Sequence, residues 1–486
     1  MRLNWFSPLP PAKSGIAGYT ARILPALQER AEIMLWTDQD EWDSDLENVA
    51  DVRHYQVDRM PWADLNRADA SIYHIGNNPL FHTSIWQVSC QQPGVVILHD
   101  LCLQNLFAGI YRDRRNDRAG YAAQLERFYG WVGGQDADAF WNDRLLLDYM
   151  VEHYPLTPLA VNGALGVLVH TQEGQDLLQL EGHCPVVYAP LPYPASPRRH
   201  ENRSATKGLG TRDQPYRIVV FGHLDVNRRL DALLEALAGI AEKHRFRLDL
   251  YGQLWNIVPV RGMIQSLGLQ RLVTIHGFVP KGELEAALAA ADLAVNLRFP
   301  TMGEASLSQL QIWDHALPTL VTRVGWYASL PEDAVAFVRP ECEIMDIQAH
   351  LRAFLADPGR FTKMGENGRR ILEKCHTAEA YAAVVMSLAA AAQRFRPLTA
   401  AHNLAKRVGA ELKTLTGLTV PLVVSQLWEQ YDDLRPQESD TGQQAAALQG
   451  IRQAVVEHLE KLRRQRAVAL QGIRQALAEQ LEQLRR

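Results

Sequence analysis

The chain of 486 residues contains little cysteine. Its five cysteines are widely scattered, and no two of them form a Cys-x-x-Cys pair: they are Cys90, Cys102, Cys184, Cys342 and Cys375. This spacing argues against a disulfide framework and against a zinc site. We therefore expect buried free thiols in a protein of a reducing compartment.

An apolar leader and a membrane-spanning run are also missing from the sequence. The N-terminal stretch MRLNWFSPLPPAKSGIAGY has no apolar core and is interrupted by prolines, unlike a signal peptide. No uninterrupted apolar run approaches the ~20 residues that span a bilayer. The net charge of −5 provides no general basic field, so we expect no nucleic-acid partner. We expect a cytoplasmic protein, with peripheral contact at the inner face of the membrane as an open alternative.

Hydrophobic residues make up 47% of the chain, a fraction that suits ordinary globular cores. Up to about residue 195, helical patterns alternate with the short β-prone runs LNWFS, AEIMLWT, ASIYHIG, GVVILHD and GVLVHT. This alternation predicts a parallel sheet built from βα units. Residues that follow the carboxyl ends of such strands bind ligands. The residues found there are Gly15, Gly18, His74, Asn77, His99, Asp100, His170 and Thr171.

A polar, basic stretch rich in Pro, Gly and Ser covers residues 196–214 and predicts a linker. A second α/β pattern follows over residues 215–380, with the strand-like runs YRIVVFGHL, FRLDLYGQ, LVTIHGFV, LAVNLRF and LPTLVTRV. The two similar halves predict an α/β protein with two Rossmann-like domains, residues 1–195 and 215–380, that face a cleft. Residues 381–435 predict further helices.

The segment 442–486 contains an internal repeat, because ALQGIRQA occurs twice with a shift of 22 residues. Its apolar stripe has a period of about 3.67 residues, which predicts a straight or slightly right-handed coiled coil. Eight Lys or Arg against four Glu give this segment a net charge of +4. A homo-oligomer or a helical partner is the first interpretation, a basic helix on an anionic membrane the second, and a solvated helix the third.

Two glycine-containing strand ends are candidate phosphate sites. The loop with Gly15 and Gly18 precedes a helical pattern, and glycines there allow backbone N–H groups to approach a phosphate. Gly222 ends a strand and is followed by Arg228 and Arg229 at a predicted helix start. A guanidinium in that place can bind a diphosphate through paired hydrogen bonds. Plain turns and solvated arginines are the alternatives.

The stretch RFPTMGEASLSQLQ, residues 298–311, predicts the entrance to a helix after Gly303 and Glu304. Glu304 and Gln311 lie seven residues apart, so on one helix they would share a face two turns apart. A Gln at position 311 retains one carbonyl acceptor and gains two donors, but it carries no charge.

Several segments, taken in order, resemble a known family. They are PLPPAKSGIAGYTARILPAL, IGNNPLFH, GVVILHDLCL, FGHLDVNRRLDALLEAL, LVTIHGFVPKGEL and VNLRFPTMGEASLSQLQIWDHALPTLVTRVGW. Together they look like a bacterial retaining glycosyltransferase of family four, of the polysaccharide type, with the GT-B fold. The resemblance covers roughly residues 1–395.

This resemblance implies a nucleotide-sugar donor bound mainly by the C-terminal domain and an acceptor bound mainly by the N-terminal domain. It implies retention of the anomeric configuration and no metal or other cofactor. No paired-carboxylate DxD element stands at a strand end, which agrees with that expectation. (Asp136 and Asp138 spell DAD, in a context that predicts a helix start.)

The resemblance assigns roles to positions of this sequence. His99, Arg228 and Glu304 are expected to be catalytic, with Glu304 on the hydroxyls of the donor sugar. The donor-binding set is Gly15, Gly18, Gly222, Arg228, Arg229, Phe278, Val279, Gly303, Glu304, Ala305, Ser306, Leu307 and Gln311. The acceptor side is Asn77, His99 and Asp100.

Two departures from the family pattern stand out. Many relatives have Arg immediately after the strand Gly, where this chain has His223. Relatives carry a second Glu on the nucleotide ribose where this chain has Gln311, and their first Glu aligns with Gly303. We therefore expect nucleotide binding to be retained but weakened.

The sequence thus predicts transfer of a sugar from a UDP-, GDP- or TDP-linked donor to a glycan, lipid-linked or protein-linked acceptor, in surface polysaccharide or glycoconjugate biosynthesis. The rival hypothesis is a catalytically weak GT-B scaffold that binds a nucleotide or glycan and organises an assembly through its coiled coil. His74, His82, His170 and His276 are expected to be structural. Of the eleven tryptophans, only Trp326 is a candidate for stacking on carbohydrate.

Overall fold

The computed structural model describes residues 1–180, 184–197 and 209–394. The chain divides into two compact units, Met1–Phe395 and Arg396–Arg486. The predicted coiled coil at 442–486, and most of the predicted helices in 381–435, therefore lie outside the described residues. None of the helices within the described ranges combines the length and apolar character needed to cross a bilayer.

The N-terminal half forms a seven-stranded parallel sheet in the order β3-β2-β1-β4-β5-β6-β7. Its strands are β1 (Arg2–Phe6), β2 (Glu32–Thr37), β3 (Asp51–His54), β4 (Ala70–Ile75), β5 (Val95–Leu98), β6 (Gly166–Val169) and β7 (Val186–Tyr188). All residues of β5 and β6 are buried. Such continuous apolar burial is expected when helices cover both faces of a parallel sheet.

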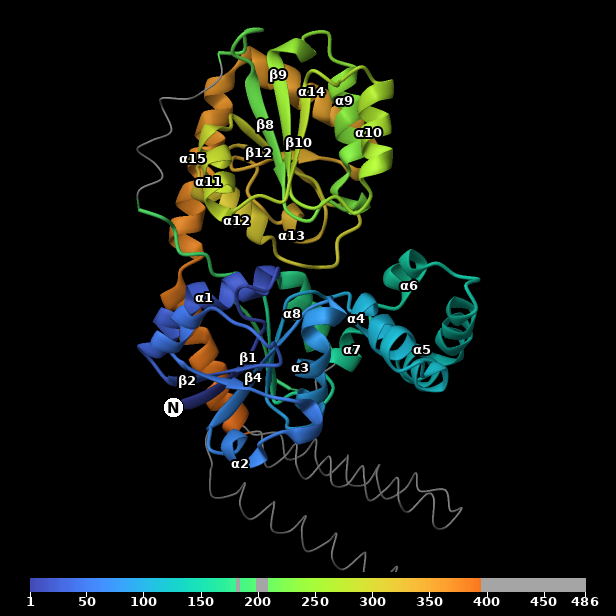
Figure 1. The fold of residues 1–486 in the computed structure, drawn as a ribbon, viewed down its shortest axis with the longest axis vertical. Helices are drawn as coiled ribbons and strands as arrows, with labels where there is room; N and C mark the ends of the chain where they lie inside the picture. The colour runs from blue at the N-terminus through green and yellow to red at the C-terminus, as the bar shows by residue number, and fades with distance from the viewer. Residues whose placement is uncertain (181–183, 198–208, 395–486) are drawn as a thin grey trace, which may run out of the picture. The chain divides into compact units, whose positions relative to one another are not determined.

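Helices cover the seven-stranded sheet on both faces (Figure 1). The helices of this half are α1 (Gly15–Gln28), α2 (Trp62–Leu65), α3 (Pro79–Gln91), α4 (Gln104–Ala108), α5 (Arg118–Trp141), α6 (Leu147–His153), α7 (Thr157–Ala160) and α8 (Gln172–Gln179). Of these, α5 and α6 project to one side of the sheet (Figure 1). Ser14 caps α1 by accepting a hydrogen bond from Ile16 N. Tyr19 and Ile23 of α1 pack on Trp5 of β1, so α1 covers the core face with its apolar stripe.

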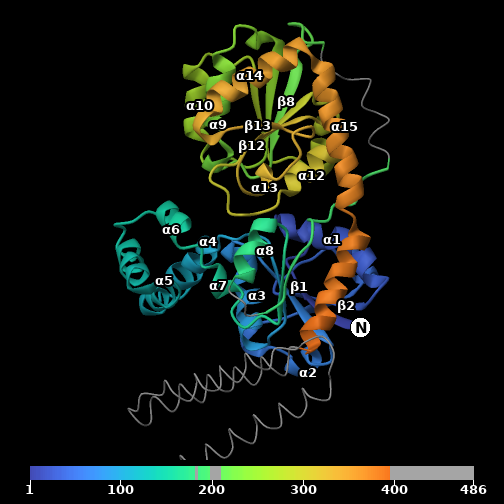
Figure 2. The same ribbon diagram turned by 180° about the vertical axis from the view of Figure 1, so that it is seen from behind.

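The C-terminal half forms a six-stranded parallel sheet in the order β10-β9-β8-β11-β12-β13. Its strands are β8 (Tyr216–Phe221), β9 (Phe246–Tyr251), β10 (Val273–Gly277), β11 (Leu293–Asn296), β12 (Thr319–Thr322) and β13 (Ala336–Val338). Its helices are α9 (Leu230–Ala238), α10 (Ile257–Ser266), α11 (Lys281–Ala290), α12 (Leu307–Asp314), α13 (Gly325–Ala328), α14 (Glu343–Ala356) and α15 (Pro358–Cys375). Helices α9, α10 and α14 lie on one face, and α11, α12 and α15 on the other (Figures 1 and 2).

The ten strand-like runs of the sequence are all strands in the structure. The three strands that sequence reasoning missed are β3, β7 and β13, each of only three or four residues and each at a sheet edge. Edge strands have one partner and little apolar alternation, which weakens their sequence signal.

In both parallel sheets the order in which strands are added reverses at an equivalent point. The first strand, β1, pairs with β2 on one side and with β4 on the other, and β8 pairs in the same way with β9 and β11. Ligand sites of doubly wound sheets lie outside the strand ends at such a point. The loops to inspect are therefore those after β1, β4 and β5, and those after β8 and β11.

The helix over residues 378–394 returns the chain to the first sheet. Its Tyr381, Val385 and Leu388 share a core cluster with Leu3 and Trp5 of β1. The same cluster includes Trp313 and Trp326 of the C-terminal half. Trp326 is 6% exposed and is thus a packing residue, with little surface for stacking on a carbohydrate.

Candidate functional site

The turn after β8 allows an arginine to lie against the backbone. Gly222 has a φ of +107°, a conformation that favours glycine. A Cβ added there would lie 3.1 Å from Arg228 Nη2. Glycine at this position therefore sets both the direction of the turn and the room for the guanidinium.

Arg228 is only 5% exposed and contacts neutral groups alone. Its Nε donates to the His223 carbonyl oxygen (3.2 Å), and its Nη1 donates to Asn296 Oδ1 (2.6 Å). Among the described residues, no carboxylate pairs with Arg228 within 4.0 Å. Burial, together with the positive charge of Arg298, lowers the pKa of Arg228 to about 10. A buried cation without a counter-ion is costly, so this position favours a bound anion.

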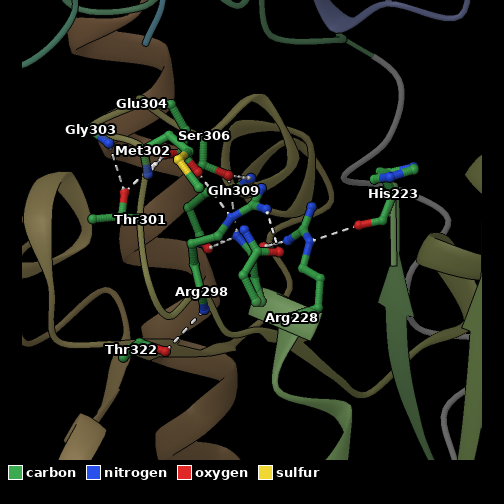
Figure 3. Close-up of polar contacts among 12 residues, drawn as sticks. His223, Arg228, Arg298, Thr301, Met302, Gly303, Glu304, Ser306, Gln309 and Thr322 are labelled. Carbon is green, nitrogen blue, oxygen red and sulfur yellow. Dashed lines mark hydrogen bonds and ion pairs between the residues drawn. The ribbon is translucent and has the colours of Figure 1, made fainter. Parts of the chain in front are cut away.

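Arg298 follows β11 and lies beside Arg228 (Figure 3). Its backbone N–H donates to Thr322 Oγ1 (3.0 Å), and its Nη1 donates to Asn227 Oδ1 (3.2 Å). Its Nε lies 2.9 Å from Glu304 Oε1, and its side chain is 18% exposed. Sequence reasoning did not select Arg298. The available signal was a single arginine directly after the apolar strand run LAVNL.

Glu304 belongs to a loop that its own carboxylate holds together. Oε2 accepts hydrogen bonds from Thr301 Oγ1 (2.9 Å) and Met302 N (2.8 Å), while Oε1 pairs with Arg298. Helix α12 begins only at Leu307, with Ser306 as its N-cap. The expectation that Glu304 and Gln311 share a helix face is therefore wrong, because the chain is still a loop at 304.

A buried amide network fixes the start of α12. Asn296 Nδ2 donates to Gln309 Oε1 (3.1 Å), and Gln309 Nε2 donates to Thr319 Oγ1 (3.3 Å). Ser306 Oγ accepts from Gln309 N (3.1 Å). Because Asn296 also binds Arg228, the network connects the helix start to the buried cation. Asn296 and Gln309 were missed from the sequence, since isolated amides in apolar runs carry no distinctive pattern.

Gln311 is bonded to an acid on the neighbouring helix. Its Nε2 donates to Glu285 Oε1 (3.1 Å), and the other oxygen, Oε2, lies 2.7 Å from His315 Nε2. A carboxylate is therefore present beside position 311, although it comes from α11. This arrangement explains the amide in physical terms, because an acid at 311 would face Glu285.

Arg229 turns toward different partners. It has a φ of +53° and stands at the N-cap of α9. Its Nη2 lies 2.7 Å from Glu343 Oε2, and its Nη1 lies 3.4 Å from Asp231 Oδ2. The guanidinium of Arg229 is thus neutralised by two carboxylates, in contrast to that of Arg228.

At the corresponding end of the first sheet lies a cluster of neutral rings. His99 follows β5, and its Nε2 is joined to His74 Nδ1 by a hydrogen bond of 2.9 Å. Tyr19 meets the His99 ring edge-on at 5.3 Å between centroids, and the His170 ring is 5.2 Å from His99. Burial and the neighbouring imidazoles lower the pKa of His99 well below its usual range. His99 therefore stays uncharged at neutral pH and acts as a hydrogen-bonding group.

Asp100 and Asn77 lie together beside His99. Asp100 Oδ2 accepts a hydrogen bond from Asn77 N (2.7 Å). Burial, and next the charge of Glu304, raise the pKa of Asp100 to about 7. The three residues expected on the acceptor side thus lie together after the carboxyl ends of β4 and β5.

The two halves touch through the Glu304 loop and the start of α12. The N–H groups of Leu101 and Cys102 both donate to the Met302 carbonyl oxygen, at 2.8 and 2.9 Å. A Cβ on Gly303, which has a φ of +76°, would lie 2.6 Å from Leu101 Cβ. A Cβ on Gly15 would lie 3.2 Å from Leu307 Cδ1. The first glycine loop therefore lies next to Leu307 at the start of α12. Ala305 and Ser306 directly precede this residue.

The remaining predicted donor-side residues are Phe278, Val279 and Gly18. Phe278 is 68% exposed, with Lys13 Nζ 4.8 Å above its ring, and Val279 is partly exposed beside it. His276 pairs with Asp249 at 2.9 Å and stacks on Tyr251, as expected for a structural histidine. Gly18 lies near the Arg22 guanidinium, which a Cβ there would approach to 3.6 Å.

The described residues contain no group of three or more His, Cys, Asp or Glu that could hold a metal ion. Asp136 and Asp138 lie within α5, near its end, where sequence reasoning expected a helix start. Asp138 pairs with Arg118 at 2.8 Å, and Asp136 accepts the Tyr149 and Tyr154 hydroxyls.

Comparison with known proteins identifies the fold and one family match. The model of the family described as Glycosyl transferases group 1 matches residues 202–371. HepE of Anabaena, solved in complex with UDP, is similar at 14% identity and a TM-score of 0.53, over 79% of this chain and 99% of that chain. A sucrose-phosphate synthase of Thermosynechococcus elongatus is similar at 16% identity and a TM-score of 0.53, over 82% and 100%.

WaaG, a glycosyltransferase of lipopolysaccharide biosynthesis, is similar at 15% identity and a TM-score of 0.50, over 79% of this chain and 99% of that chain. No curated protein matches the sequence. At these identities the structural likenesses establish the fold, and the family match covers the C-terminal half. The chain has the GT-B fold, and its residues 202–371 match the glycosyl transferases of group 1.

Proposed function

We propose that the protein is a glycosyltransferase that moves a sugar from a nucleotide-sugar donor to a glycan, lipid-linked or protein-linked acceptor. The observation that carries this proposal is Arg228, a buried guanidinium with no carboxylate partner among the described residues. It lies beside a glycine turn at the point where the strand order reverses, which is where doubly wound folds bind phosphates. The family match over residues 202–371 supports the same activity.

The chemistry explains the placement of the cation. Transfer breaks the bond between the sugar C1 and the diphosphate, so negative charge builds up on the leaving group while the sugar gains oxocarbenium character. Stabilising charge that develops in the transition state is usually the largest catalytic contribution. In our proposal Arg228 performs this role, with the N–H groups at the start of α12 and in the Gly15–Gly18 loop as further donors.

On the acceptor side, uncharged groups suit a polyhydroxylated substrate. We propose that His99, Asn77 and Asp100 bind and orient the acceptor hydroxyl near the donor C1. A neutral imidazole can donate one hydrogen bond and accept another. The lowered pKa of His99 keeps it in this neutral form at the pH of the cell.

A uridine nucleotide is the first donor to test. HepE structures with TM-scores of 0.53 and 0.52 were solved with UDP and with UDP-glucose. We propose that Phe278 and Val279 contact the base, and that Gln311 with Glu285 contacts the ribose. GDP- and TDP-sugars stay in the panel, because no contact seen in the chain selects a base. We also propose a retaining, metal-independent reaction in surface polysaccharide or glycoconjugate biosynthesis, which follows from the family resemblance.

A scaffold that binds a nucleotide without turnover is the second candidate. Two observations favour it: His223 is exposed and supplies only its carbonyl to the site, and position 311 carries an amide. Two observations argue against the scaffold: Arg228 is buried without a carboxylate partner among the described residues, and His99, Asn77 and Asp100 lie together.

The deciding experiment is a turnover panel with UDP-, GDP- and TDP-sugars, with and without EDTA, in which released nucleoside diphosphate is measured. We expect at least one donor to be hydrolysed or transferred, with the same rate in EDTA. NMR of the product then assigns the anomeric configuration. Binding of a donor without any turnover would support the scaffold instead.

A further inference from the structure

The guanidiniums of Arg228 and Arg298 lie close together in a largely buried region. Arg228 comes from the turn after β8 and Arg298 from the end of β11, and Figure 3 shows their side chains converging. The two are close enough to interact, since the charge of Arg298 contributes to the lowered pKa of Arg228. Two like charges in a region shielded from water repel each other strongly.

The negative charge nearby does not balance this pair. Glu304 pairs with Arg298 at 2.9 Å, and Arg228 has no carboxylate partner within the described ranges. Asp100 provides little, because its pKa of about 7 leaves it only partly ionised at neutral pH. The region therefore holds more positive than negative charge, which favours a bound anion.

Arg298 is held in this place by three separate contacts. Thr322 fixes its backbone, Asn227 binds Nη1 from the β8 turn, and Glu304 lies against Nε. A guanidinium oriented from three elements loses little freedom when it binds a ligand. The imidazole of His223 does not supply this second cation, since it is exposed and His223 contacts Arg228 through its carbonyl oxygen.

We infer that Arg298 is the second cation of the donor diphosphate site, and that Glu304 is the positioning residue that orients it. This inference rests on the proposed function, because it takes the ligand of Arg228 to be a diphosphate. Arg228 and Arg298 together offer a fork of N–H donors to the two phosphates. The carboxylate of Glu304 then acts through Arg298 on the diphosphate.

The test is calorimetric titration of the full chain with inorganic pyrophosphate and with UDP. The variants are Arg298→Met, Arg298→Lys and Arg228→Met, with Arg261→Met, an exposed arginine of α10, as the matched loss of charge. We expect Arg298→Met and Arg228→Met each to weaken pyrophosphate binding by ~10–100-fold, as for a lost charge-assisted hydrogen bond. Arg298→Lys should retain part of the affinity, and Arg261→Met should bind as the parent protein does.

The role of Glu304 is tested by a double-mutant cycle of Glu304→Gln and Arg298→Lys with pyrophosphate, which carries no sugar. If Glu304 acts through Arg298, the two changes are coupled and their effects on affinity do not multiply. Fully independent effects would show that Glu304 does not position Arg298. Melting curves identify variants that do not fold. If a variant does not fold, the comparison uses Arg298→Lys, which keeps the charge, and the rescue variant His223→Arg in the Arg298→Lys background.

The outcomes separate the two proposals. If Arg228→Met loses pyrophosphate while Arg298→Met and Arg298→Lys bind as the parent protein does, the inference about Arg298 is wrong and the proposed function stands. If the parent protein binds neither pyrophosphate nor UDP, the diphosphate site itself is wrong and the proposed function falls with it. Parallel losses in Arg228→Met and Arg298→Met, with partial retention in Arg298→Lys, support both.

Discussion

The two sheets place chemically opposite groups at equivalent points. In both, the strand order reverses beside the first strand. Neutral imidazoles and a phenol lie at this point of the seven-stranded sheet, and guanidiniums lie at this point of the six-stranded sheet. His99 and His170 avoid charge because burial opposes it. Arg228 cannot avoid charge at neutral pH, since even a lowered pKa of about 10 leaves it protonated. The same strand order therefore places neutral hydrogen-bonding groups in one half and a buried cation in the other, which we propose bind acceptor hydroxyls and an anion respectively.

The comparison also separates two ways of burying polar groups. The histidines of the first sheet bind one another and the backbone, as in the bond from His170 Nδ1 to the Ala189 carbonyl oxygen. On the second sheet Arg229 and Arg298 pair with carboxylates, whereas Arg228 has no carboxylate partner among the described residues. Burying a neutral imidazole costs less than burying the unpaired Arg228 cation, so a bound anion would stabilise the second arrangement more.

The largest expected effect concerns the acid sensitivity of the first sheet. Burial lowers the pKa values of His82 and His170 to about 4. Histidines of the unfolded chain titrate near 6.5, so between pH ~6.5 and ~4 the unfolded state binds more protons. These two histidines should therefore lower the free energy of unfolding by about 3–6 kcal/mol as pH falls through this window. Asp100 opposes the loss over the same window, because its raised pKa of about 7 lets the folded state bind a proton first.

Denaturant unfolding at pH 7 and pH 4.5 measures this loss. His82→Gln should reduce the pH dependence, while the same change at the exposed His54 should leave it as it is. Equal pH dependence in all three proteins would contradict the buried neutral histidines.

The next effect concerns the unpaired cation of the second sheet. Arg228→Met should lower donor turnover by ~10²–10³-fold, the usual loss when a charge-stabilising donor is removed. The ligand-free protein should be as stable as the parent or more so, because an uncompensated buried charge is gone. Steady-state kinetics and melting curves are read on the same samples. Reduced stability with normal turnover would reverse the assignment.

Arg229 provides the contrast within the same turn. Arg229→Ala leaves the nearly buried Glu343 carboxylate without its main partner, so we expect a loss of about 2 kcal/mol in the free energy of unfolding. Turnover per folded molecule should change less than threefold. A loss of turnover equal to that of Arg228→Met would instead show that Arg229 assists at the phosphates.

A smaller effect is expected at His99, and it concerns the KM for the acceptor rather than the affinity for the nucleotide. His99→Ala should raise the KM for the acceptor by ~10-fold, the value of about one hydrogen bond to a substrate. The affinity for UDP should not change, since His99 lies on the other sheet. Calorimetry with UDP and kinetics at varied acceptor concentration separate the two. A weaker affinity for UDP alone would place His99 on the donor side.

The smallest effect is expected at Gln311. Gln311→Glu would place two carboxylates where Gln311 now donates to Glu285, so it should not improve UDP affinity and should lower the melting temperature slightly. The double change Gln311→Glu with Glu285→Gln moves the acid to the other helix. It should return the melting temperature and the UDP affinity to those of the parent protein. A clear gain in turnover from Gln311→Glu alone would favour the scaffold hypothesis for the natural chain.

Sequence patterns predicted the two sheets well, because long buried strands such as β8 and β11 carry a strong apolar signal. Gly222 and Arg228 were also recognised, since a glycine turn and a cation after a strand form a local motif. Arg298 and Glu285 were missed because their importance depends on contacts between distant segments, Arg298 with Asn227 and Glu285 with Gln311. The helical geometry expected for Glu304 and Gln311 was wrong because Ser306 caps α12 two residues after Glu304.

The most direct test of the central claim is the release of nucleoside diphosphate from UDP-, GDP- and TDP-sugars by the parent protein and by Arg228→Met, measured side by side. Our account predicts that the parent protein turns over at least one donor and that Arg228→Met turns over the same donor ~10²–10³-fold more slowly. A parent protein that neither binds nor turns over any of these donors would contradict it.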